Sequence, residues 1–176
     1  ARGAFAKAAW LQAWVPAASL QLALIDARSG HADAALVSVR TALALRPQHL
    51  QLRNLEVVLL RRLGRQDEAD SLLAATLVLD PLDLWTRQLA GQLRHGHGQL
   101  EAQALLDVAL ENARAGGVAT ALELCDLART ADETRPLGQT ACGVLADYVA
   151  ALILERSGDR TGASSRRARA RSGERT

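Results

Sequence analysis

Apolar residues recur along much of this chain at steps of three and four residues, which is the spacing of one face of an α-helix. Between residues 50 and 63, four leucines keep this spacing: Leu52, Leu55, Leu59 and Leu63. The arginines of the same segment lie off that line. No segment alternates apolar and polar residues for long enough to predict a strand. The pattern therefore predicts an all-α protein.

Glycines, prolines and polar clusters divide this pattern into about nine or ten predicted helices. Their expected ranges are 4–14, 17–29, 32–45, 48–63, 66–79, 82–94, 100–115, 118–130, 137–157 and 160–170.

A period of 34 residues underlies the pattern. The pairs Gly30 and Gly64, Ala35 and Ala69, and Pro47 and Pro81 are each 34 residues apart. Glycine tolerates the left-handed conformation that ends many helices, so each of these glycines predicts a helix stop and a chain reversal. An alanine five residues later lets two helix axes approach closely. Each proline is expected to begin the next helix at its first position, with Asp80 as the cap before Pro81.

The same pattern, a glycine followed five residues later by an alanine, recurs at irregular distances further along the chain. Gly116 and Gly158 each have an alanine five residues later, at Ala121 and Ala163. A small residue also stands seven positions before each of the four glycines: Ala23, Val57, Ala109 and Ala151. The expected helix pairs lie near residues 17–45, 48–79, 100–130 and 137–170, with an unpaired helix at 82–94 and a longer loop at about 130–137. The unpaired helix is expected to end at His95–Gly98.

The composition favours helices that pack through small side chains. Hydrophobic residues make up 49% of the 176 residues but aromatic residues only 3%, so the core must be built from Ala, Leu and Val. A chain of this length can bury a core without disulfides or metals. It has neither a signal-peptide pattern nor a run of about 18 apolar residues. We therefore expect no membrane partner, and the cytoplasm is the expected compartment, although nothing in the sequence fixes it.

Positive charge is concentrated at the C-terminal end. The net charge is +2, but residues 156–176 hold seven arginines against Asp159 and Glu174. A terminal arginine run is most often solvated. We therefore predict a helical repeat domain at residues 1–157, followed by a basic C-terminal helix or tail at 158–176 that is partly disordered.

The residues that usually carry chemistry do not form a recognisable site. Cys125 and Cys142 lack the spacing of a metal motif and are expected to be buried thiols. His95 and His97 could donate two metal nitrogens, but no third ligand is close in sequence. Nucleophile elbows, phosphate loops and dinucleotide fingerprints are absent. We therefore expect no catalytic residue, cofactor or metal.

The text NLEVVLLRRLGRQDEADSLLAATLVLDPLDLW resembles a tetratricopeptide repeat, with Val57, Gly64, Ala69 and Pro81 in the characteristic places. The resemblance implies an α-solenoid, a right-handed superhelix of antiparallel helix pairs whose inner groove holds a peptide or another protein. The aromatic positions expected early in each repeat are occupied by other residues: Ser19, Arg53, Leu105 and Asp147.

A narrower resemblance extends over most of the chain. The texts LRRLGRQDEA, LDPLDLWTRQLAG and DVALENARAGGVATAL, with a later helix ending in LERSGD, are similar to the helical C-terminal region of large bacterial proteins. In those proteins a β-rich domain related to sugar-processing enzymes precedes the helices. The resemblance implies that this chain is a fragment of such a protein.

Two kinds of side chain are candidates for partner binding. Tryptophans can anchor a partner's side chains, and arginines on one groove face suit acidic peptides. The candidates are Trp10, Trp14, Arg53, Arg61, Trp85, Arg87 and Arg94. The alternative is that the tryptophans fill gaps between helices and the arginines are solvated.

The leading functional hypothesis is a protein-interaction or scaffold module whose partner is a protein or an upstream domain of the same chain. A second hypothesis is an accessory helical domain of a carbohydrate-active enzyme, which packs on the upstream β-domain and contributes to its substrate cleft. Nucleic-acid binding by the arginine-rich end is the third and is not expected. The sequence does not fix the oligomeric state.

Overall fold

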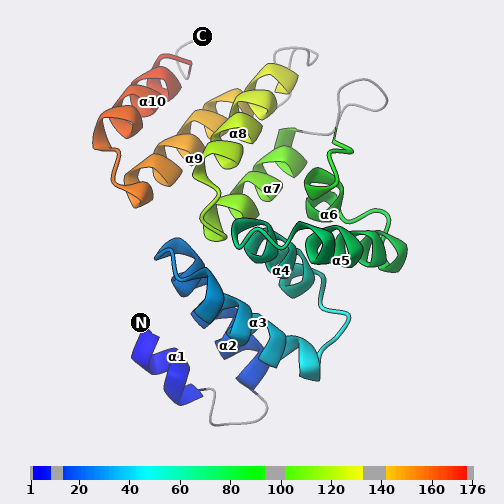
Figure 1. Ribbon diagram of the computed structural model, residues 1–176. Helices are drawn as coiled ribbons and strands as arrows, with labels where there is room; N and C mark the ends of the chain where they lie inside the picture. The colour runs from blue at the N-terminus through cyan, green and yellow to red at the C-terminus, as the bar shows by residue number, and fades with distance from the viewer. Residues whose placement is uncertain (1, 9–13, 94–101, 133–141, 174–176) are drawn as a thin grey trace. The chain divides into compact units, whose positions relative to one another are not determined.

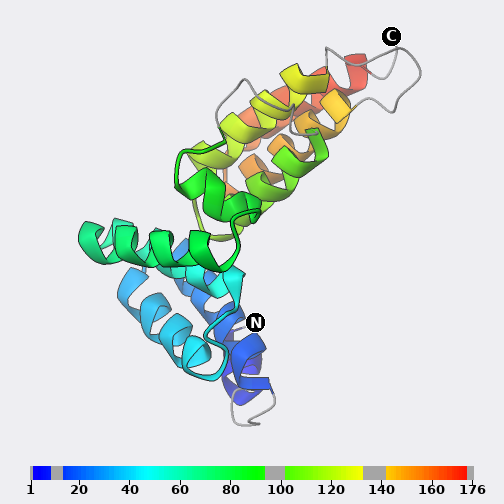
Figure 2. The same cartoon turned by 90° about the vertical axis from the view of Figure 1, so that its right-hand side faces the viewer.

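The computed structural model describes residues 2–8, 14–93, 102–132 and 142–173 (Figures 1 and 2). Helices occur throughout these ranges and strands do not, which confirms the predicted all-α class. The chain divides into two compact units, residues 1–93 and 94–176. Among the described helices, none combines the length and the apolar character that a membrane span requires.

The first unit is built from helices that follow one another as hairpins. Its described helices are α1 (Arg2–Ala8), α2 (Val15–Arg28), α3 (Ala32–Leu45), α4 (Leu50–Arg62), α5 (Gln66–Leu79) and α6 (Leu84–Leu89). Helix α2 packs against α3, and α4 packs against α5. Helix α3 also contacts α4, so the two pairs stack side by side (Figure 1).

The second unit repeats the arrangement. Its described helices are α7 (Ala102–Arg114), α8 (Val118–Asp132), α9 (Cys142–Ser157) and α10 (Arg160–Gly173). Helix α7 pairs with α8, and α9 pairs with α10, while α8 and α9 pack against each other between the pairs. The domain boundary predicted between residues 157 and 158 falls inside this unit. The loop predicted at about 130–137 begins within α8, and residues 133–141 lie outside the described ranges.

The four repeat glycines end helices as predicted. Gly30, Gly64, Gly116 and Gly158 have φ angles of +81°, +73°, +85° and +96°. At the end of α4, the Arg65 amide donates to the Leu60 carbonyl at 2.9 Å and the Gly64 amide donates to the Arg61 carbonyl at 3.1 Å. These bonds satisfy carbonyls that a helix end leaves without partners.

The predicted small residues form the seams between helices. Each of the eight is at most 2% exposed: Ala23, Ala35, Val57, Ala69, Ala109, Ala121, Ala151 and Ala163. Leucines fill the spaces beside the seams, and four of them are almost wholly buried in α4: Leu52, Leu55, Leu59 and Leu60. The period of small residues therefore marks where helix axes come closest, because a larger side chain there would push them apart.

The prolines do not begin helices, and this expectation was wrong. Pro47 and Pro81 lie in turns, and the following helices begin three residues later, at Leu50 and Leu84. The cap of α6 is Asp83 rather than Asp80, since the Asp83 carboxylate accepts the Thr86 amide at 2.8 Å.

Helix α6 is shorter than the predicted helix at 82–94. It ends at Leu89 because Gly91, with φ +69°, makes the same turn as the four repeat glycines. The Gln92 amide donates to the Arg87 carbonyl at 2.8 Å, which closes the turn. The predicted stop at His95–Gly98 lies outside the described residues.

Cys125 is buried in α8, as predicted, and burial raises the pKa of its thiol to about 12. The thiolate is the reactive form, so we expect Cys125 to react with a disulfide reagent at pH 8 roughly a thousandfold more slowly than an unfolded cysteine. The rate should be measured in a Cys142→Ser background, with the urea-unfolded chain as control. Equal rates in the folded and unfolded chains would contradict the burial of this thiol.

Candidate functional site

Two of the arginines proposed as groove residues, Arg53 and Arg61, make hydrogen bonds within the first unit. Arg53 donates to the Thr76 hydroxyl at 2.9 Å and to the Pro47 carbonyl at 3.1 Å. Arg61 donates to the carbonyl of Leu89, the last residue of α6, at 2.9 Å. Its neighbour Arg62 donates to the carbonyl of Ala27 in the last turn of α2, at 3.1 Å. Guanidinium groups satisfy helix-end carbonyls and interact favourably with the helix dipole, so these side chains are already committed to packing.

The tryptophans lie in different environments. Trp85 is 4% exposed and belongs to the core of the first unit, so its ring does not face a partner in this structure. Trp14 precedes α2 and is 60% exposed. Arg87 is half-buried on α6. Trp10 and Arg94 lie outside the described residues. The structure therefore leaves Trp14 as the one exposed aromatic side chain among the described candidates.

The acidic residues near Pro81 have local structural roles. The Asp80 carboxylate accepts the Leu82 amide at 2.9 Å, which shapes the turn. Asp83 also accepts from the Asn54 amide group at 2.8 Å, and this bond joins the start of α6 to α4. The Thr86 hydroxyl donates to the Asn54 side-chain oxygen at 2.9 Å inside the core. Within the described ranges, no group of three or more His, Cys, Asp or Glu side chains could hold a metal ion.

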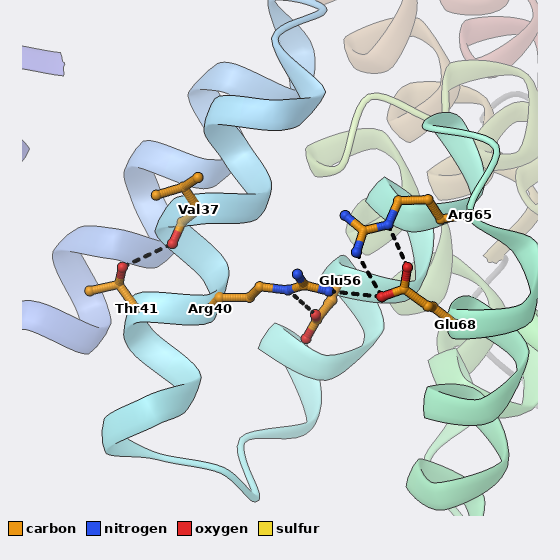
Figure 3. A network of polar contacts seen from close by, with 6 residues as sticks. All are labelled: Val37, Arg40, Thr41, Glu56, Arg65 and Glu68. Atoms are coloured by element: carbon orange, nitrogen blue, oxygen red, sulfur yellow. Dashed lines mark hydrogen bonds and ion pairs between the residues drawn. The ribbon is translucent and has the colours of Figure 1, made fainter.

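A shallow hollow of about 390 Å³ lies where α3, α4 and α5 meet. Three of its charged residues, Arg40, Glu56 and Glu68, belong to one polar network (Figure 3). Arg40 on α3 donates to Glu56 on α4 at 2.7 Å and to Glu68 on α5 at 3.4 Å. Arg65 donates to both oxygens of Glu68, at 2.6 and 2.7 Å. These hydrogen bonds hold the pKa of Glu68 below its usual value.

The network makes the hollow a helix junction rather than a binding site. Arg40 links three helices, because it lies on α3 and pairs with one carboxylate on α4 and one on α5. A ligand cation would have to displace Arg40 or Arg65 from carboxylates that they already neutralise. Hydrogen bonds between charged groups are stronger than neutral ones, so the existing pairs compete directly with a ligand.

An exposed row of apolar side chains runs along α9. Leu145, Tyr148 and Leu152 are 42%, 36% and 38% exposed, and their steps of three and four residues place them on one helix face. We call these three residues the α9 row. Four other apolar side chains of α9 are buried: Ala146, Ala150, Ala151 and Ile153. Helix α9 therefore has one face in the core and another apolar face outside it.

Sequence reasoning overlooked the α9 row, although a signal was present. The α9 text CGVLADYVAALILERS carries apolar residues on all sides of the helix. A helix of this kind is either buried all round or has an apolar face left over for another molecule. Among the described residues of the first unit, six other large apolar side chains are exposed: Trp14, Val37, Leu45, Val78, Leu79 and Leu82. They do not follow a single helix face.

On its buried side, α9 is joined to α8 and α10 by a network of ion pairs. Arg166 on α10 binds both carboxylate oxygens of Asp126 on α8, at 2.5 and 2.9 Å. Its other contact is Asp147 on α9, at 3.2 Å, and Arg169 approaches the same carboxylate at 3.6 Å. The Asp147 side chain is only 5% exposed. This network joins three helices and holds the α9 row in a fixed orientation.

Within the arginine-rich end, Arg166 is thus less solvated than its sequence suggested. Helix α10 continues to Gly173, and the Arg166 side chain is 16% exposed. Arg167 pairs with Glu155 of α9. The sequence cannot show this, because Asp126 and Asp147 are distant from Arg166 along the chain.

Three solved structures show a distant likeness to this chain. The sequence matches no family model and no curated protein. A solved structure described as "Crystal structure of MamA" is 14% identical, with 99% of this chain and 86% of that chain covered and a TM-score of 0.43. "MamA 41-end from Desulfovibrio magneticus RS-1" is 12% identical, with coverages of 92% and 96% and a TM-score of 0.43. "Crystal structure of MamA protein" is 16% identical, with 93% of each chain covered and a TM-score of 0.40.

Proposed function

We propose that this chain is a protein-interaction module and that the α9 row is its binding surface. The observation that carries the proposal is the exposure of Leu145, Tyr148 and Leu152 on one face of a helix whose other face is buried. Contiguous exposed apolar residues mark interaction sites more often than isolated ones do. The charged clusters point the same way, because the carboxylates at Arg40 and Arg166 are occupied by tertiary ion pairs.

The size of the row favours a short segment over a folded partner. The three side chains are each only 36–42% exposed, so together they offer far less surface than the about 800 Å² that each partner buries in a stable protein interface. A second copy of this chain meeting the row alone would bury too little surface to form a stable dimer. An amphipathic helix that lays its apolar face along the row fits the available length.

The resemblance to large bacterial proteins suggests where such a segment could come from. We include in the proposal that the partner segment belongs to an upstream domain of the same polypeptide. A polypeptide containing both parts is then expected to protect the α9 row from solvent. Hydrogen exchange of α9 in that longer protein, compared with this chain alone, tests this part separately.

The binding surface can be tested without knowing the natural partner. A phage-displayed library of random 16-residue peptides should be selected on this chain, and the selected peptides measured by fluorescence anisotropy. Because each row side chain is covered on binding, Leu152→Asp is expected to weaken the peptides by about tenfold or more. Leu145→Asp should act in the same direction.

Val37→Asp is the matched control, since Val37 is an exposed apolar residue on α3 of the first unit and does not belong to the row. Its effect on affinity should be less than twofold. Far-UV circular dichroism must show that all variants keep their helices. Selected peptides that bind Leu152→Asp and Leu145→Asp as well as the original chain, or a selection that yields no binder, would contradict the proposed function.

A further inference from the structure

Arg156 continues the line of the α9 row. Counting from Leu152 it is one helical turn further along, so positions 145, 148, 152 and 156 follow each other at steps of three and four residues. Arg156 is exposed. Among the residues that the structure describes, no carboxylate pairs with it, because the adjacent Glu155 is bound by Arg167. The row therefore ends in an available guanidinium group.

From this alignment we infer that the partner of the α9 row is an amphipathic helix carrying a side-chain carboxylate that meets Arg156. The inference rests on the proposed function and adds the charge of the partner. A planar guanidinium binds a carboxylate through two parallel hydrogen bonds, which gives direction as well as attraction. A purely apolar partner would offer no hydrogen-bond acceptor to the Arg156 guanidinium at the end of the row.

The helix dipole offers a simpler reason for a cation at this position. Arg156 lies in the last turn of α9, where positive charge is favourable. That role does not depend on any partner and predicts no effect on peptide binding. The two explanations therefore separate cleanly in a binding experiment.

The geometry fixes the spacing expected in the partner. Eleven residues separate Leu145 from Arg156, which corresponds to about 16 Å along a helix. A parallel partner helix should carry apolar residues at i, i+3 or i+4, and i+7, with Asp or Glu near i+11. An antiparallel partner should carry the acidic residue first and the apolar residues near four, eight and eleven positions later.

The same peptide selection tests this inference. We expect the enriched sequences to show one of these two spacings, with the acidic position filled well above its frequency in the unselected library. For a selected peptide, Arg156→Gln and replacement of its acidic residue by glutamine should each weaken binding about three- to tenfold. Combining both changes should cause little further loss, because they remove the same contact.

Charge reversal gives a second readout. Arg156→Glu should weaken the acidic peptide further, and a lysine in place of the peptide's acidic residue should restore binding to that variant. Arg160→Gln is the matched control, because Arg160 is an exposed arginine at the start of α10 and lies outside the row. Its effect should be less than twofold.

The failures of the two proposals are distinguishable. Peptides that require Leu152 but lack acidic enrichment, or that bind Arg156→Gln unchanged, would overturn this inference and leave the binding surface intact. Peptides insensitive to Leu152→Asp would overturn the proposed function itself. Concentration-dependent dimers in sedimentation velocity that disappear in Leu152→Asp would show that a second copy covers the row, and would overturn the acidic-helix inference.

Discussion

Arg166→Met is expected to destabilise the second unit by about 3 kcal/mol, because removing one partner of a buried ion pair leaves the other charge without compensation. Asp147 is the residue most affected, since its nearly buried carboxylate would keep only Arg169, at 3.6 Å. Asp126 is about half exposed and can be rehydrated. Because only one of the two carboxylates stays buried without compensation, the expected loss of stability lies at the lower end of the range for buried ion pairs.

The loss of stability should be measured in the helices of the second unit that the network joins. Hydrogen exchange of peptides from α8, α9 and α10 should become about a hundredfold faster, if exchange reports on opening of this unit. Arg167→Met is the matched control, because Arg167 and Glu155 form an exposed pair worth no more than about 0.5 kcal/mol. Equal effects of the two substitutions would show that the Arg166 network does not hold the three helices.

The same network predicts a pH dependence. The hydrogen bonds from Arg166 hold the pKa of Asp126 below its usual value of 3.8. A carboxyl group with a lowered pKa in the folded protein stabilises it above the unfolded pKa, and this stabilisation is lost as the pH falls through the folded value. The second unit should therefore become less stable below about pH 4. In Arg166→Met, the decline attributable to Asp126 should be smaller.

Ala69→Trp is expected to destabilise the first unit by about 3 kcal/mol or more, because overfilling a close-packed seam forces the helices apart. Ala69 is fully buried on α5, five residues after Gly64, where α5 crosses α4. The indole has no space at this crossing. Urea unfolding followed by far-UV circular dichroism gives the change in free energy.

A tryptophan at Ala75 provides the comparison on the same helix. Ala75 is exposed on α5, so the substitution there should change stability by less than about 0.5 kcal/mol. Faster hydrogen exchange of residues 50–79 in Ala69→Trp would show that the loss of stability arises in α4 and α5. If both tryptophans were tolerated equally, Ala69 would not lie at a helix crossing.

The sequence predicted the hairpins well because their determinants are local. Gly64 and the other repeat glycines end helices through their own backbone freedom, and Ala69 marks a crossing through its size. Gly91 was missed for an instructive reason: it lies 34 residues after Val57, a helix-interior position in the previous repeat. A glycine weakens a helix interior by only about 1 kcal/mol, so its effect depends on neighbours that the local sequence does not show.

The candidate site was harder to predict because it depends on distant contacts. Arg53 and Arg61 looked like groove residues, yet each meets a helix end or a hydroxyl group from another helix. Trp85 was a candidate for either an anchor or a filler between helices, and it is buried in the core. The α9 row left a trace in the sequence as a helix that is apolar on all sides. Which of those sides stays exposed is decided by α7, α8 and α10 together.

The six-residue length of α6 has a consequence for how the first unit assembles. A helix this short does not persist alone in water, because nucleating it fixes several residues for very few hydrogen bonds. Its two ends are held by groups that α4 supplies: Asn54 at the Asp83 cap and Arg61 at the Leu89 carbonyl. As the chain leaves the ribosome, α6 is therefore not expected to become ordered before α4 is in place.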